Sequence, residues 1–129
     1  MNTYLLIDDD NIIQFVHQNV IGKTDPDGRV FTVSSVEEAF RFLSDSNQPS
    51  PNLVFLDINM PIQNGFDFLD ELQLNHEDVL RRLKQDARVF LLTSSVNPRD
   101  VDKSKEYPII EGLIPKPLNT ALLENLLAS

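Results

Sequence analysis

Short apolar runs rich in branched and aromatic residues recur along the chain and predict five β-strands. They cover residues Tyr4–Ile7, Val30–Val33, Leu53–Leu56, Val89–Leu92 and Gly112–Ile114. Three of the runs are continuous rather than alternating, which is typical of strands covered on both faces, as in parallel sheets. The pattern therefore indicates a buried parallel sheet.

The segments between these runs have apolar residues at helical spacing and predict five helices. Four of the helices carry stripes that we expect to face the core: Ile12, Ile13, Val16, Val20 and Ile21; Ala39, Phe40 and Leu43; Phe66, Leu69 and Leu72; and Leu122, Leu123, Leu126 and Leu127. Signals for helix starts are Ser35, Asn64-Gly65, Asn97-Pro98 and Asn119, and Gly22 is a stop signal for the first helix. Residues 75–88 stay open, because Leu80, Leu83 and several charges fit either a longer third helix or an extra turn.

Strands that alternate with helices imply right-handed crossovers, with helices on both faces of the sheet. The predicted fold class is therefore α/β, a doubly wound five-stranded parallel sheet with five helices. A chain of 129 residues is long enough for one domain with a substantial core and too short for a second module. We expect residues 1–129 to form one domain without an output domain.

Composition and charge exclude several classes of protein. The chain has 41% hydrophobic and 24% charged residues, and no apolar run approaches the roughly 18 residues of a membrane helix, so we expect no membrane segment. The absence of cysteine excludes disulfides and thiolate metal sites. A net charge of -9 argues against direct nucleic-acid binding, which depends on Lys and Arg. The N-terminus does not resemble a signal peptide, and a cytoplasmic location fits these features.

Acidic residues stand at the ends of two predicted strands. Asp8 and Asp9 follow the first strand, and Asp57 follows the third. In an open parallel sheet, ligands bind beyond the carboxyl ends of the strands, so neighbouring first and third strands would bring these carboxylates together. Two unit charges about 4 Å apart repel by roughly 4 kcal/mol at an effective dielectric near 20. Such a cluster needs a cation, and its hard oxygen ligands favour Mg²⁺.

Two further polar residues lie at later strand ends. Thr93 ends the fourth strand, and Lys116 follows the fifth. A carboxylate, a divalent ion, a hydroxyl and an ammonium group suit phosphoryl transfer, which needs a nucleophile, neutralised charge and accurate positioning. Asp57 would be the nucleophile.

The order of these residues resembles the receiver domains of bacterial two-component response regulators, over essentially the whole chain. The matching segments are Asp8-Asp9, Asp57-Ile58-Asn59-Met60-Pro61, Asn64-Gly65, Thr93-Ser94 and Lys116-Pro117. Each segment alone is a weak signal, but their order at the ends of successive strands is specific. The resemblance implies a flavodoxin-like sheet of order 2-1-3-4-5.

The resemblance also implies how the acids act. Asp57 would accept a phosphoryl group from the phosphohistidine of a sensor histidine kinase or a histidine phosphotransfer protein. Asp9, Asp57 and the main-chain carbonyl of Asn59 would bind Mg²⁺ directly, and Asp8 would act mostly through water.

In the family, the residues at the Lys116 and Thr93 positions contact the phosphoryl oxygens. Lys116 would first pair with the acceptor carboxylate, and the bond between Lys116 and Pro117 is usually cis. Many members carry Tyr or Phe three residues before this lysine, and that ring turns inward when the threonine moves. This chain has Leu113 there, which places the aromatic form of the switch in doubt, and Tyr107 is out of register for that role.

Other polar residues have simpler expected positions. Asp10 is expected to cap a helix or to be a solvated acid. His17 and His76 are too far apart in sequence for a local metal motif and are expected at the surface. Exposed residues are also expected on the output surface, namely Lys103, Lys105 and Tyr107.

The leading interpretation is a single-domain response regulator that catalyses only its own phosphorylation and dephosphorylation and acts by binding an unidentified protein. A phosphorelay intermediate and an unphosphorylated scaffold on the same fold are alternatives. A haloacid-dehalogenase-type Mg²⁺ phosphatase is less favoured, because that chemistry wants a second acid where this chain has Asn59. The glycines match no phosphate-binding loop, which disfavours nucleotide binding.

Overall fold

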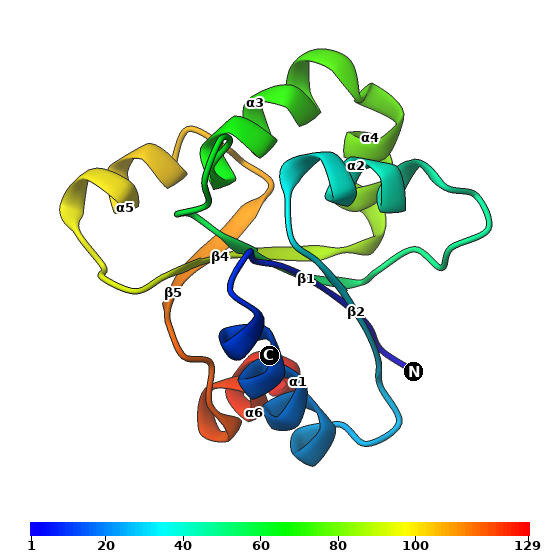
Figure 1. The fold of residues 1–129 in the computed structure, drawn as a ribbon, viewed down its shortest axis with the longest axis vertical. Coiled ribbons are helices and arrows are strands. Elements are labelled where there is room, and N and C mark those ends of the chain that lie inside the picture. Colours follow the sequence, from blue (N-terminus) through cyan, green and yellow to red (C-terminus); the bar gives the residue numbers. More distant parts are fainter.

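The fold is a five-stranded sheet covered by helices on both faces (Figure 1). The computed structural model describes residues 1–129. The elements are β1 (Thr3–Ile7), α1 (Asn11–Thr24), β2 (Arg29–Val33), α2 (Val36–Ser44), β3 (Leu53–Asp57), α3 (Gly65–Asn75), α4 (Glu77–Asp86), β4 (Arg88–Thr93), α5 (Pro98–Ser104), β5 (Ile110–Pro115) and α6 (Thr120–Ala128). All neighbouring strands are parallel and the order is β2-β1-β3-β4-β5, which confirms the predicted fold class and strand order.

The two faces of the sheet bury separate apolar clusters. Helices α1 and α6 cover one face, and α2 to α5 lie on the other (Figure 1). Successive side chains of a strand point to opposite faces, so in β1 Leu5 and Ile7 join the larger cluster while Tyr4 and Leu6 join the smaller one. Every residue of β3 is buried, which explains its continuous apolar sequence. None of the helices is both long and apolar enough to cross a membrane.

The helix count differs from the prediction. The structure has six helices rather than five, because residues 77–86 form α4, separate from α3. The break falls at His76, whose ring stacks on Phe40 with centroids 4.0 Å apart. Helix α4 is strongly charged and buries only Val79 and Leu83, so its apolar signal in the sequence is weak.

The predicted helix starts are observed as side-chain caps. The side chains of Ser35, Asn64, Asn97 and Asn119 each accept a hydrogen bond from a backbone N–H in the first turn that follows. Asp10 caps α1 in the same way, through bonds from the N–H groups of Ile12 and Ile13. Local sequence therefore fixes where these helices begin.

The predicted core stripe of α1 is wrong in its first half. Ile12 is 76% exposed and Val16 is exposed as well, whereas Ile21 is buried and Val20 packs against the smaller cluster. The other buried residues of the helix are Gln14 and His17. The helix also continues through Gly22 to Thr24. The apolar pattern failed because two polar side chains on the inner face find backbone partners in the core.

Two further expectations about exposure are corrected. His17 was expected at the surface but is fully buried, and His76 is half-buried. Tyr107 was expected to be exposed, yet it is buried, because its hydroxyl donates to Asp70 at 2.6 Å and its ring stacks on Phe66. The other two residues of that surface, Lys103 and Lys105, are exposed as expected.

Replacing Gly65 with alanine is expected to destabilise the fold. A Cβ atom at Gly65 would lie 2.7 Å from the carbonyl oxygen of Asp57, so the start of α3 could not stay against the end of β3. Gly65→Ala should lower the free energy of unfolding by about 1–3 kcal/mol. Urea unfolding followed by circular dichroism measures this change.

Gly22→Ala is the matched control for that substitution. Gly22 lies within α1, and nothing lies within 4 Å of a Cβ built there. The same chemical change should therefore stabilise the protein, by roughly 0.5–1 kcal/mol. A Gly65→Ala protein as stable as the parent chain would contradict the close approach of α3 to β3.

Candidate functional site

The turn after β1 holds the first acidic residues. The backbone N–H of Asp8 donates to the carbonyl of Val33 at the end of β2. The Asp8 carboxylate is buried and accepts a hydrogen bond from the N–H of Asp10 at 2.9 Å, while Asp9 is exposed. The turn thus directs one acid inward and leaves the next facing solvent.

Asp57 is the last residue of β3 and is buried. Its Oδ1 accepts a hydrogen bond from the N–H of Asn59 at 3.2 Å. Strands β1 and β3 are neighbours, so their ends bring Asp57 to the acids that follow β1. One carboxylate oxygen from each of Asp8, Asp9 and Asp57 lies within 4.8 Å of the other two. Such a cluster of hard oxygen atoms suits Mg²⁺ or Mn²⁺.

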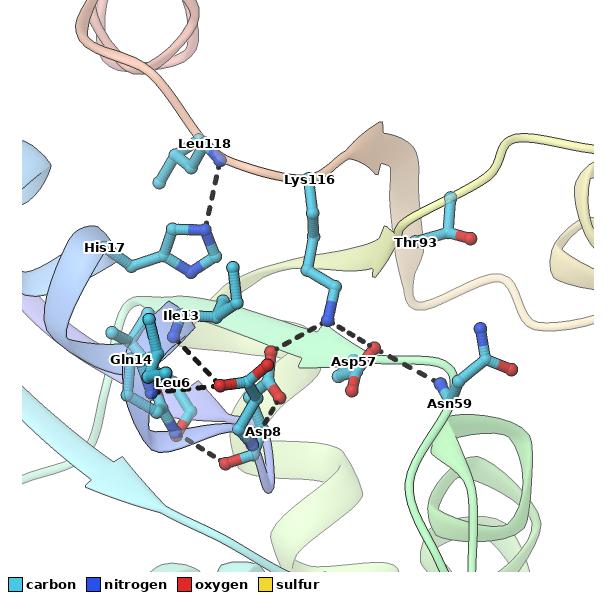
Figure 2. A network of polar contacts seen from close by, with 12 residues as sticks. Leu6, Asp8, Ile13, Gln14, His17, Asp57, Asn59, Thr93, Lys116 and Leu118 are labelled. Atoms are coloured by element: carbon cyan, nitrogen blue, oxygen red, sulfur yellow. Dashed lines mark hydrogen bonds and ion pairs between the residues drawn. The ribbon is translucent and has the colours of Figure 1, made fainter.

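Lys116 brings one positive charge to this cluster (Figure 2). It follows β5, and its backbone N–H donates to the carbonyl of Thr93 at 2.7 Å. Its Nζ lies 3.1 Å from Asp8 Oδ2 and 3.1 Å from Asp57 Oδ1. The Lys116–Pro117 peptide bond is cis, as the resemblance implied.

The charges at the site are only partly balanced. Burial raises the pKa of Asp57 to about 6, and the charge of Asp8 adds to this effect, although Lys116 and the Asn59 amide oppose it. Burial would lower the pKa of Lys116, but its bonds to the two carboxylates outweigh that effect and raise this pKa. One ammonium group pairs with two of the three clustered carboxylates, so the site favours further positive charge.

Two of the expected site residues point away from the acids in this conformation. Thr93 is buried at the end of β4, and its hydroxyl donates to the carbonyl of Ser95 at 2.9 Å and accepts from the Ser95 N–H at 3.2 Å. Asn59 is exposed, and its side chain points away from Asp57 (Figure 2). Only the backbone of Asn59 lies in reach of the acids, through its N–H.

Sequence reasoning missed two polar residues beside the site. Gln14 and His17 lie on the inner face of α1 and contact the backbone near Asp8 and Lys116 (Figure 2). The available signal was their spacing of three, with Ile21 four residues further on, which places all three residues on one helical face. Apolar residues elsewhere on the helix hid that signal.

Comparisons with known proteins agree with this geometry. The model of the response regulator receiver domain matches residues 4–128. A two-component response regulator from Cytophaga hutchinsonii has a similar structure, with 31% identity and a TM-score of 0.80, covering 98% of this chain and 93% of that chain. The Mn²⁺-bound form of the response regulator Rcp1 has 28% identity and a TM-score of 0.74, covering 98% and 88% of the two chains.

Curated relatives point to the same family. Rcp1 from Synechocystis sp. is 31% identical over 109 residues, which are 81% of this chain and 70% of that protein. Hybrid signal transduction histidine kinase D from Dictyostelium discoideum is 31% identical over 75 residues, and these are 58% of this chain but 5% of that protein. The chain therefore belongs to the response regulator receiver domain family.

Proposed function

We propose that Asp57 accepts a phosphoryl group from the phosphohistidine of a sensor histidine kinase or a histidine phosphotransfer protein. The observation that carries this proposal is the position of Lys116 Nζ, 3.1 Å from both Asp8 and Asp57 within a cluster of three carboxylates. Receiver domains are regulators rather than classical enzymes, so the phosphorylated chain would act by binding another protein.

The donor set fits a divalent ion. Asp9, Asp57 and the carbonyl of Asn59 would hold Mg²⁺, with Asp8 acting through water. The ion would neutralise charge on the transferring phosphoryl group. The three acids lie close together, and burial and the charge of Asp8 raise the pKa of Asp57. A bound cation would oppose both the repulsion and the raised pKa.

The remaining roles follow from the chemistry of phosphoryl transfer. An Asp57 oxygen attacks phosphorus, and the bond from phosphorus to the imidazole nitrogen breaks with its electron pair passing to that nitrogen. A proton from solvent then leaves the donor histidine as a neutral ring. Lys116, already at the carboxylate, would pair with a phosphoryl oxygen. The Thr93 hydroxyl would exchange its bond to Ser95 for one to another phosphoryl oxygen.

Exposed apolar side chains near the site favour a protein as the phosphodonor. Ile12 and Phe15 lie on the outer face of α1, in its first turns after the acidic residues. Ile62 is fully exposed on the loop after Asp57 and adopts a φ of 70°, which is unfavourable for a branched residue. Such residues gain little inside this chain and would gain from contact with a partner.

The output surface would include α5, β5 and α6. Helix α5 contains no buried residue, so its position depends on the segments that flank it. Leu113 on β5 is half-buried and packs against the larger apolar cluster, where many relatives have an aromatic ring. The added charge on Asp57 would then bias an existing equilibrium between positions of α5. This shift would not require an aromatic ring at residue 113.

The alternatives have less support from this site. A relay intermediate would use the same acceptor chemistry and pass the phosphoryl group on to a histidine. A haloacid-dehalogenase-type phosphatase needs a second acid near the nucleophile, but Asn59 stands there and its side chain points away (Figure 2). The direct test is therefore whether Asp57 becomes phosphorylated.

Asp57→Asn is expected to abolish uptake of a phosphoryl group. The parent chain, incubated with acetyl phosphate and Mg²⁺, should gain one base-labile phosphoryl group, detected by intact mass. Asp10→Asn is the matched control, because Asp10 belongs to the same acidic run but caps α1, and asparagine caps a helix equally well. Repeated turnover of small phosphoesters would instead support the phosphatase, and binding of partners without phosphate uptake would support the scaffold.

Removing the Asp57 charge is also expected to stabilise the metal-free protein. Because the pKa of Asp57 is raised from 3.8 to about 6, the folded chain keeps a proton in that range that the unfolded chain has released. The free energy of unfolding of the parent chain therefore falls as pH rises through this range. Asp57→Asn lacks this titration and should be more stable than the parent chain at pH 7, by roughly 1–3 kcal/mol.

Urea unfolding between pH 4 and 8 in EDTA measures this difference. Asp27→Asn is the control, because it removes an exposed acid away from the site and should change stability by no more than about 0.5 kcal/mol. Added Mg²⁺ should stabilise the parent chain more than Asp57→Asn. An Asp57→Asn protein that is less stable than the parent chain at pH 7 would contradict the raised pKa of Asp57.

Thr93→Ala is expected to separate phosphate acceptance from its effect on α5. The variant should still accept the phosphoryl group, because Asp57 and Lys116 are unchanged. Binding of beryllofluoride should shift the backbone amide resonances of α5 in the parent chain and in Thr93→Ser, which keeps the hydroxyl, but not in Thr93→Ala. Equal shifts in all three proteins would exclude the Thr93 hydroxyl from the response.

A further inference from the structure

Helix α1 buries polar side chains where an apolar face would be expected. Gln14 and His17 are almost completely buried, while Ile12 and Phe15 of the same helix face solvent. Apolar side chains at positions 14 and 17 would fill the same space without desolvating a polar group. The polar groups therefore need an explanation beyond packing.

Gln14 holds the backbone on which the acidic turn is built. Its Nε2 lies within hydrogen-bond distance of three carbonyl oxygens: Leu6 at 3.2 Å, Asp8 at 3.0 Å and Val33 at 3.1 Å. The Val33 carbonyl also accepts the N–H of Asp8. One side chain thus ties the ends of β1 and β2 together at the residue that faces Lys116 (Figure 2).

His17 holds the turn that carries Lys116. Its Nε2 accepts the backbone N–H of Leu118 at 3.0 Å, two residues after Lys116, and both partners are buried. Accepting at Nε2 places the ring proton on Nδ1, which has no hydrogen-bond partner. Burial lowers the pKa of His17, so the ring stays neutral and able to accept.

Each residue keeps one buried polar atom without a partner. These atoms are Gln14 Oε1 and His17 Nδ1. An unpartnered buried polar atom is unfavourable, so the bonds made by the other end of each side chain must offset that cost. Those bonds end on the backbone within two residues of Asp8 or Lys116, or on the Val33 carbonyl that also accepts the N–H of Asp8.

We propose that Gln14 and His17 are positioning residues for phosphoryl transfer, Gln14 for the acidic turn at Asp8 and His17 for the turn at Lys116. This inference rests on the proposed function of the site. Because both residues project from one face of α1, the helix sets the distance between the Asp8 carboxylate and the Lys116 amine, which come from opposite ends of the chain.

The two residues act on different parts of the site, so their loss should have different effects. Gln14→Met keeps the size of the side chain but removes the donor, so the acidic turn loosens and Mg²⁺ affinity should fall by roughly 10- to 100-fold. His17→Leu removes the acceptor for Leu118 and displaces Lys116. The phosphorylation rate at saturating Mg²⁺ should then fall by roughly 10- to 100-fold, while Mg²⁺ affinity stays the same or rises, because a competing positive charge has moved away.

The experiment measures both properties in each variant. Isothermal titration gives Mg²⁺ affinity, intact mass gives the rate of phosphorylation from acetyl phosphate, and the ¹⁵N resonance of Lys116 Nζ reports its position without any phosphate. His17→Gln supplies another acceptor and should restore most of the rate. Gln18→Met makes the same change as Gln14→Met on the exposed face of α1 and should alter neither property.

The outcomes separate this inference from the proposed function. If the parent chain takes up no phosphate, the proposed function is wrong, and the Mg²⁺ and Lys116 measurements still test the positioning roles. If Gln14→Met and His17→Leu lower both properties by the same factor, the two residues only maintain the fold and the inference is wrong. It is also wrong if His17→Leu leaves both the rate and the Lys116 resonance unchanged.

Discussion

The structure depends on holding two buried carboxylates, Asp8 and Asp57, on either side of one ammonium group. Lys116 lies 3.1 Å from each of them, and its charge offsets only part of their mutual repulsion. The pKa of Asp57 is raised, first because the carboxylate is buried and then because Asp8 repels its charge. A site in this state is stabilised by a divalent cation, because the cation offsets the negative charge that the lysine leaves unbalanced.

The strand order determines how these three groups meet. Strands β1 and β3 are neighbours, so Asp8 and Asp57 come together from adjacent strand ends, whereas β4 separates β3 from β5. Lys116 must therefore reach past the end of β4, where Thr93 binds its backbone N–H. The four-carbon stem of lysine spans that gap and delivers a point charge to both acids.

Local signals in the sequence were enough to predict most of the framework. Continuous apolar runs gave the buried strands, and residues such as Asn64 and Asn119 gave helix starts that the structure shows as side-chain caps. The order of short motifs placed the acids and Lys116 at strand ends, where the structure brings them together. Their roles in catalysis and metal binding stay predictions.

Two parts of the chain could not be predicted in the same way, because apolar spacing alone does not describe them. In α4 only Val79 and Leu83 are buried among many charges, and this short stripe fits a continuation of α3 as well as a separate helix. In α1 the inner face is defined by Gln14 and His17, whose burial depends on backbone carbonyl and amide groups from β1, β2 and the turn after β5. Those partners are close only after the sheet has formed. A polar residue buried by tertiary contacts therefore looks, in sequence, like a residue of the solvent face, and the exposed Ile12 looks like core. That inversion follows from one constraint: α1 begins directly after the acidic turn, so its inner face first holds the turn in place, and apolar packing resumes at Val20 and Ile21.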